Sequence, residues 1–333
     1  MKILKQSIGI DVSKNDFKVC LGVIDDRLET RNVYEHVYVN DKKGIKQFIK
    51  DITTKAEQLI PIYFVMEATG VYHQELAYAL ANKELPVVIL LPNKAKSFSK
   101  SINIRAKSDI IDAKLLCQMG LERKLTTWQP PETIFAVLKV LTREREALVL
   151  QRSKLKNQLH AYQTAFVKAD KTISRIKGHI TYLTKQINDT QADMRALVKQ
   201  SQPVADKIKK ITKIKGLSFL SVVTILAETD GFNIILNQKQ LIGYSGLDVQ
   251  VDQSGEKSIK GRITKKGNSH LRKALYMPAL SACRNNSTMK LFYTQLNQRQ
   301  KAKKQGVIAV QRKLLLLTYS LWKTGQDYLE NCA

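Results

Sequence analysis

A long heptad pattern in the middle of the chain restricts the fold more than any other feature. Eight positions from Ile173 to Leu197 alternate spacings of three and four residues, and seven of them are apolar. Such a repeat is the seam of a helix that packs lengthwise against another helix. Upstream, a second row recurs every seven residues: Leu141, Leu148, Leu155 and Tyr162. With a turn at 168–172, residues 126–204 are predicted to form two antiparallel helices, a coiled-coil arm for packing or oligomerisation.

The region before the arm, residues 1–125, alternates strand and helix patterns. Strands are predicted at 8–12, 17–23, 33–39, 62–66 and 87–91, and helices at 44–59, 72–81 and 109–119. The run Ile62–Met66 is continuously apolar, as expected for a central strand that is buried on both faces. Three strands followed by βαβ alternation predict an α/β domain with a mixed sheet and helices on both faces.

The region after the arm, residues 205–333, is predicted to be mainly helical. It opens with the basic run Lys207–Lys215, a glycine at 216 and an apolar helix that reaches Ala227. Helix, short glycine turn and helix is the pattern of a helix-hairpin-helix, whose turn offers backbone N–H groups to phosphate. Lys213 and Lys215 lie at this turn and are candidate nucleic-acid contacts.

The charge balance indicates a polyanionic partner. The 333 residues include 55 Lys and Arg against 29 Asp and Glu, a formal net charge of +26. A protein with this excess repels itself unless a polyanion neutralises it, so nucleic acid is the expected partner. The apolar stretches are too short to span a bilayer, and the four cysteines lack metal-ligand spacing. We expect a cytoplasmic, nucleoid-associated protein without membrane contact.

Four carboxylates occupy positions suited to binding metal ions. Asp11 lies on the first predicted strand, Glu67 directly follows the buried strand, and Asp109 and Asp112 share one face of a helix. A ribonuclease-H-like sheet uses acids in this arrangement to hold two divalent ions. Mg²⁺ (or Mn²⁺) prefers such hard oxygen ligands, and two ions stabilise both the attacking and the leaving oxygen at phosphorus.

These acids are also compatible with a structural role or with a different fold. A single aspartate at a strand end is usually a turn former, and Asp109 can simply cap its helix. An actin-like sugar kinase also opens with a Gly-Ile-Asp strand, but its phosphate loops are rich in glycine. The segment from Asp11 to Asp16 contains no glycine.

A basic, glycine-containing segment follows in the third region. Glycines at 255, 261 and 267 allow a close backbone approach to phosphate, and Ser254 precedes the first of them. A serine hydroxyl can attack phosphorus if cations stabilise the developing charge, although serine before glycine is more often only a turn. Candidate nucleic-acid contacts in this segment are Lys257, Lys260, Arg262, Lys265, Lys266 and Arg272.

Several motifs resemble the catalytic segments of DEDD-type insertion-sequence transposases. In the RuvC-like N-terminal domain of that family these are Gly9-Ile-Asp-Val-Ser-Lys14, Met66-Glu-Ala-Thr-Gly-Val-Tyr72 and Lys107-Ser-Asp-Ile-Ile-Asp-Ala-Lys114. In its C-terminal transposase domain they are Gly243-Tyr-Ser-Gly-Leu247, Gln253-Ser-Gly255 and Gly261-Arg-Ile-Thr-Lys-Lys-Gly-Asn268. The resemblance runs essentially from end to end, with the three regions in the same order.

The resemblance implies a recombinase that is guided by a structured non-coding bridge RNA pairing with donor and target DNA. It implies Mg²⁺ held by the four carboxylates, a 5′-phosphoserine link through Ser254, and a homo-oligomer, dimer or tetramer, built partly through the coiled coil. Family members often carry a second glycine after Ser-Gly, where this chain has Glu256. Ser245 and Ser258 therefore stay open as alternative nucleophiles.

Two further functions are compatible with the sequence. A RuvC-like nuclease or junction resolvase would use the carboxylates and water without a serine intermediate. A basic nucleic-acid-packaging protein would use neither, and its acids would be incidental.

Overall fold

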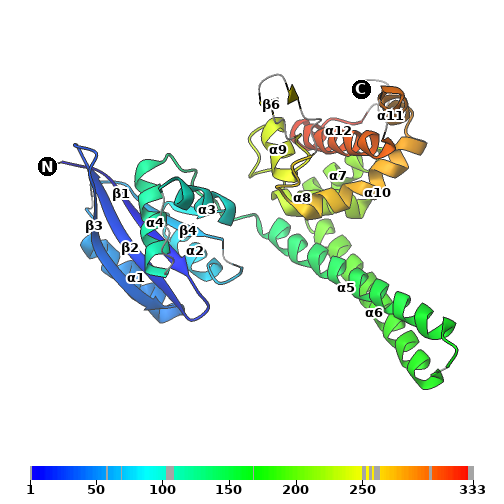
Figure 1. The fold of residues 1–333 in the computed structure, drawn as a ribbon, viewed down its shortest axis with the longest axis horizontal. Helices are drawn as coiled ribbons and strands as arrows, with labels where there is room; N and C mark the ends of the chain where they lie inside the picture. Colours follow the sequence, from blue (N-terminus) through cyan, green and yellow to red (C-terminus); the bar gives the residue numbers. More distant parts are fainter. Residues whose placement is uncertain are drawn as a thin grey trace. The chain divides into compact units, whose positions relative to one another are not determined.

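A computed structural model describes residues 2–57, 59–68, 70–102, 109–167, 169–249, 253–254, 257–258, 263–299 and 302–328. For residues 253–254, 257–258 and 299 the description is limited to the backbone. The chain divides into two compact units, Met1–Pro130 and Pro131–Ala333, which Figure 1 shows in blue to cyan and in green to red.

The first unit contains a five-stranded sheet in the order β3-β2-β1-β4-β5. Its strands are β1 (Ile3–Val12), β2 (Asp16–Asp25), β3 (Thr30–Val39), β4 (Ile62–Glu67) and β5 (Val87–Leu90). The first three form an antiparallel meander, whereas β4 and β5 run parallel to β1. The predicted mixed sheet is therefore confirmed, with longer strands in the meander than the apolar pattern predicted.

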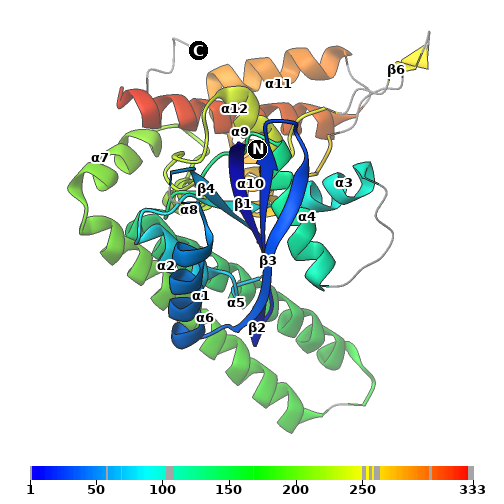
Figure 2. The same cartoon turned by 90° about the vertical axis from the view of Figure 1, so that its left-hand side faces the viewer.

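Helices cover both faces of this sheet (Figures 1 and 2). They are α1 (Lys42–Lys55), α2 (Gln74–Ala81), α3 (Pro92–Ser101) and α4 (Asp109–Glu122). Ile8 and Ile10 of β1 share a core with Phe48 of α1 and Leu76 of α2. The opposite face is covered by α4, where Cys117 shares a core with Cys20 of β2.

Two glycines allow α4 to lie directly on the sheet. A Cβ atom on Gly9 would lie 2.0 Å from the carbonyl oxygen of Ala113 and 2.2 Å from the amide nitrogen of Cys117. A Cβ atom on Gly120 would lie 1.9 Å from Oγ of Ser7. Gly9 therefore cannot carry a side chain unless the helix moves away from β1, and Gly120 lets α4 pack against the side chains of Ser7 and Val65.

The second unit begins with a hairpin of two long helices, α5 (Thr133–Thr164) and α6 (Asp170–Lys199), which lie side by side (Figures 1 and 2). We call this hairpin the arm. The residues of the predicted seam on α6 that are buried are Ile176, Leu183, Ile187, Thr190 and Met194. The turn comes earlier than predicted, because α5 ends at Thr164 and α6 already begins at Asp170. Oligomerisation through the arm stays a prediction.

The rest of this unit is mainly helical, as predicted. Its helices are α7 (Gln202–Ile211), α8 (Phe219–Thr229), α9 (Gln238–Ser245), α10 (Ser269–Asn285), α11 (Ser287–Arg299) and α12 (Lys303–Thr324). Gly216 lies between α7 and α8 with a φ of 112°, which only glycine adopts readily. No helix in the described ranges is both long and apolar enough to cross a membrane.

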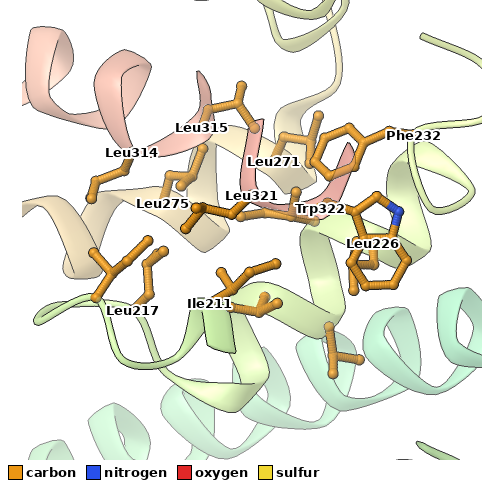
Figure 3. Close-up of a cluster of buried hydrophobic side chains, with 14 of the residues drawn as sticks. Ile211, Leu217, Leu226, Phe232, Leu271, Leu275, Leu314, Leu315, Leu321 and Trp322 are labelled. Atoms are coloured by element: carbon orange, nitrogen blue, oxygen red, sulfur yellow. The ribbon is translucent and has the colours of Figure 1, made fainter. Parts of the chain in front are cut away.

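One hydrophobic core joins the base of the arm to these helices. Figure 3 shows Ile211, Leu226, Leu275 and Trp322 from four different helices packed together. The same core contains residues from the start of α5 and from the end of α6, which together form the base of the hairpin: Phe135, Leu138, Met194 and Val198. The arm and the C-terminal helices, which the sequence patterns separate at residue 204, therefore belong to one unit.

The contact between β1 and α4 can be tested with Gly9→Ala. We expect this substitution to lower the free energy of unfolding by about 1–3 kcal/mol or more, because the new methyl group meets backbone atoms that cannot rotate away. Chemical denaturation of the full chain measures the change.

Gly178→Ala is the matched control. Gly178 lies within α6, and nothing is within 4 Å of a Cβ atom built on it. Alanine favours the helix, so this variant should be more stable by about 0.5–1 kcal/mol. Equal effects of the two substitutions would contradict the close approach.

Candidate active site

The four predicted carboxylates all belong to the first unit. Asp11 is the second-last residue of β1, and Glu67 is the last residue of the adjacent parallel strand β4. Asp109 and Asp112 form part of the first turn of α4, which packs on β1. The contact that Gly9 permits therefore brings the start of α4 toward the ends of the two central strands.

The electrostatic surroundings of Asp11 connect it with the other three acids. The pKa of Asp11 is raised from 3.8 to about 6. Burial is the largest cause, followed by repulsion from Asp112, Asp109 and Glu67, while Lys18 opposes the shift. A like charge disfavours the ionised form of a carboxyl group only at short range. Two strands and one helix thus bring the four acids into one electrostatic cluster.

Lys18 is the counter-ion of this cluster. It lies on β2 directly opposite Asp11 in the strand register, and its ammonium group forms an ion pair with Asp109. It also lies 3.5 Å from a carboxylate oxygen of Asp16. Sequence patterns alone missed Lys18, although the alternation of β1 and β2 about a tight hairpin places residue 18 across from residue 11.

The four carboxylates match a divalent cation in charge and in donor type. All are hard oxygen donors, and after burial the repulsion from the other three acids contributes to the raised pKa of Asp11. As the side chains lie, no group of three Asp, Glu, His or Cys among the described residues is close enough to hold a metal ion. Asp109 instead forms an ion pair with the Lys18 ammonium group, which supplies the positive charge that a metal ion would otherwise supply.

The segment that carries Ser254 lies in the second unit. Gln253–Ser254 (β6) and Lys257–Ser258 (β7) form a two-stranded antiparallel ladder in which Ser254 pairs with Lys257. Their side chains lie outside the described part of the chain. The same holds for Lys260, Arg262 and Glu256, the residue that stands where family members often have a second glycine. Ser245, the first alternative nucleophile, is fully buried and its hydroxyl donates to the carbonyl of Ile242.

The two ends of this segment meet in a stem, which we define as residues 246–249 and 263–268. Val249 and Ile263 form an antiparallel bridge, and the Thr264 amide donates to the carbonyl of Asp248 over 2.9 Å. The Thr264 hydroxyl also donates to the Asp248 carboxylate over 2.6 Å. The segment from 250 to 262, with Ser254, is therefore closed at its base.

The remaining predicted nucleic-acid contacts have different surroundings. Lys265 and Lys266 are exposed on the stem, and Lys215 is exposed between α7 and α8. Arg272 donates through Nη1 to the carbonyl oxygens of Ser245 and Gly267, so it also holds the stem together. Lys213 pairs with Asp327 over 2.8 Å.

Comparison with known families decides the family of this chain. A transposase model of the DEDD IS110 type matches residues 8–166, and the model described as "Transposase IS116/IS110/IS902 family" matches residues 208–294. Together they cover most of the chain and both units. The chain belongs to the IS110 family of transposases.

Relatives of this transposase include proteins that recombine DNA. The pilin gene-inverting proteins of Moraxella lacunata and Moraxella bovis are each 27% identical to it over 97% of this chain and 98% of theirs. The transposase for insertion sequence element IS1328 of Yersinia enterocolitica is 22% identical over 80% of this chain and 81% of its own. A solved T. thermophilus RuvC in complex with a Holliday junction substrate matches 34% of this chain and 90% of its own, with 13% identity and a TM-score of 0.25.

The carboxylate cluster makes a pH-dependent prediction for Asp11→Asn. Because the pKa of Asp11 in the folded state is above that of the unfolded chain, ionisation destabilises the fold as the pH rises from about 4 to about 6. In metal-free protein at pH 7.5, the variant should be more stable by about 1–2 kcal/mol, since solvent screening of this half-buried group reduces the full effect. The gain should disappear near pH 4.

Thermal unfolding across this pH range measures the effect, with Asp189→Asn on the exposed side of α6 as control. Addition of Mg²⁺ should stabilise the unsubstituted protein more than Asp11→Asn, because the ion relieves the same repulsion. A pH-independent difference between the two proteins would show that Asp11 is not part of a charge cluster.

Proposed function

We propose that this transposase cleaves and rejoins DNA strands by attack of the Ser254 hydroxyl on a DNA phosphate, with divalent ions held by Asp11, Glu67, Asp109 and Asp112. The observation that carries the proposal is the convergence of the four acids on Asp11, in a family of DNA transposases. The match of the second family model to residues 208–294, which include Ser254, supports a second functional segment.

The reaction is a transesterification. The Ser254 oxygen forms a bond to phosphorus, its proton leaves to a base, and the bond from phosphorus to the 3′ oxygen of the neighbouring nucleotide breaks. That oxygen leaves as a hydroxyl after gaining a proton, and the 5′-phosphate stays on serine. The number of phosphate ester bonds is unchanged, so the reverse step can rejoin a different strand. Mg²⁺ when bound supplies charge stabilisation at the phosphate oxygens.

The protein's own groups have separate tasks in this scheme. The four carboxylates would hold the cations, and Lys18, which forms an ion pair with Asp109, would share that carboxylate with them or compete for it. Lys265 and Lys266 are exposed on the stem and follow the Ser254 segment in the chain. Their positive charges would neutralise phosphate groups of bound DNA or RNA. We further propose that donor and target DNA are selected by a structured guide RNA and that the active assembly is a homo-oligomer. The family resemblance supports both.

A denaturing gel tests the chemistry. Purified protein is incubated with Mg²⁺, the non-coding RNA of its element and labelled target DNA, and DNA attached covalently to protein is measured. We expect an adduct that both Ser254→Ala and Asp112→Asn reduce by at least about a hundredfold, because each removes a group that acts in the transition state. Ser258→Ala is the matched control and should retain the adduct.

The opposite outcomes are informative. Cleaved DNA without any adduct would replace the serine scheme by a metal-dependent nuclease that uses water. An adduct that persists in Ser254→Ala and disappears in Ser258→Ala would move the nucleophile to Ser258.

A further inference from the structure

A buried carboxylate in the second unit takes no part in the proposed chemistry. Glu228 lies in α8, and its side chain is 0% exposed. An ionised group removed from water is costly unless charged partners and hydrogen bonds surround it. The partners of the Glu228 carboxylate therefore indicate which elements this residue connects.

Two side chains from different elements share the carboxylate of Glu228. Arg143 of α5 donates through Nε to Oε1 over 2.8 Å and through Nη2 to Oε2 over 3.0 Å. Asn268 donates through Nδ2 to Oε2 over 2.7 Å. Burial by itself would raise the pKa of Glu228, but these hydrogen bonds outweigh it and lower the pKa, so the group is ionised at neutral pH.

Asn268 connects Glu228 to the stem. It is the last residue of the stem and the N-cap of α10, and its side-chain oxygen accepts from the amides of His270 and Leu271. Its own amide donates to the carbonyl of Tyr244 over 2.7 Å, and the Tyr244 hydroxyl donates to the carbonyl of Glu228 over 2.9 Å. One residue thus joins the stem to α8, α9 and α10.

A second contact ties the start of α10, directly after the stem, to the arm. Glu146 of α5 accepts from Nδ1 of His270 and, over 2.5 Å, from Nζ of Lys273. Arg143 and Glu146 are three residues apart on α5 and so lie on one face of the helix. The base of the arm therefore contacts the start of α10 directly through Glu146, and it reaches the N-cap of α10 indirectly through Arg143 and Glu228.

We propose that Glu228 and Asn268 are positioning residues, which with Arg143 fix the stem against the base of the arm and so set the direction in which the Ser254 segment meets its phosphate. This inference rests on the proposed role of Ser254. A nucleophile on a closed segment is positioned only as well as the base of that segment, and a displacement of about 1 Å can slow a reaction about a hundredfold. Neither residue needs to touch DNA for this role.

Asn268→Ser separates the link from the helix cap. Serine caps a helix as well as asparagine, but its short side chain cannot reach Glu228. Asn237→Ser is the matched control, because Asn237 caps α9 through the amide of Gln240 and has no contact with Glu228. Both variants are made in the full chain, and their thermal unfolding is recorded first.

Two measurements decide the proposal. At saturating DNA, Asn268→Ser should form the covalent adduct at least about tenfold more slowly, with DNA affinity within about twofold of the unsubstituted protein. In the free protein, hydrogen exchange of the Thr264 and Lys265 amides, which donate to Asp248 and Gly246, should become faster. The control should change neither quantity.

Adduct formation at the unsubstituted rate, or stem amides that exchange as slowly as before, would overturn the positioning role. If the unsubstituted protein forms no adduct at all, the proposed function fails, while the exchange measurement still decides whether Asn268 and Glu228 hold the stem.

Discussion

The direct contact between β1 and α4 is the constraint on which the candidate site depends. With Gly9 and Gly120 at the contact, helix and strand backbones lie closer than any side chain would permit. Asp11 at the end of β1 and the acids of the first turn of α4 are thereby brought within electrostatic reach. Burial at this contact and, after it, repulsion from these acids raise the pKa of Asp11, and Lys18 opposes the shift. Packing and charge at this site therefore have one common cause.

In the second unit, the comparable element is the base of the arm. Phe135 and Leu138 belong to the core of the C-terminal helices, and one to three turns later the same helix α5 presents Arg143 and Glu146 to α8 and α10. Apolar burial supplies the stability, whereas in our proposal the charged contacts select one orientation of the stem. Because α5 continues without interruption into the hairpin, any partner that binds the arm acts on a helix that also contacts Glu228 of α8 and the start of α10.

Sequence patterns predicted the elements of this protein better than its contacts. The apolar run at 62–66 and the heptads of α6 indicated β4 and the arm, because burial on both faces of a strand gives a continuous apolar run and burial along one seam of a helix gives a heptad repeat. The helix α3 was missed, since its first turns are short of apolar residues, and the turn of the arm was placed too late. The positions of the four acids on the strands and the helix predict the metal site, which stays a proposal. The contacts of Glu228 and Asn268 were not predicted, because their partners are distant in the sequence. Lys18 was not predicted, because its position opposite Asp11 depends on the register between β1 and β2, which the apolar pattern alone does not fix.

The pairing of Lys18 with the acids has a consequence for how the domain forms during synthesis. Asp11 and Lys18 belong to the first hairpin, whose contacts are local and form early, whereas Glu67 and the acids of α4 emerge from the ribosome much later. Each later carboxylate therefore joins a strand pair that already contains the positive charge of Lys18. The charge of the first acid in the nascent sheet is therefore balanced by a lysine of the same hairpin, before the later acids are synthesised.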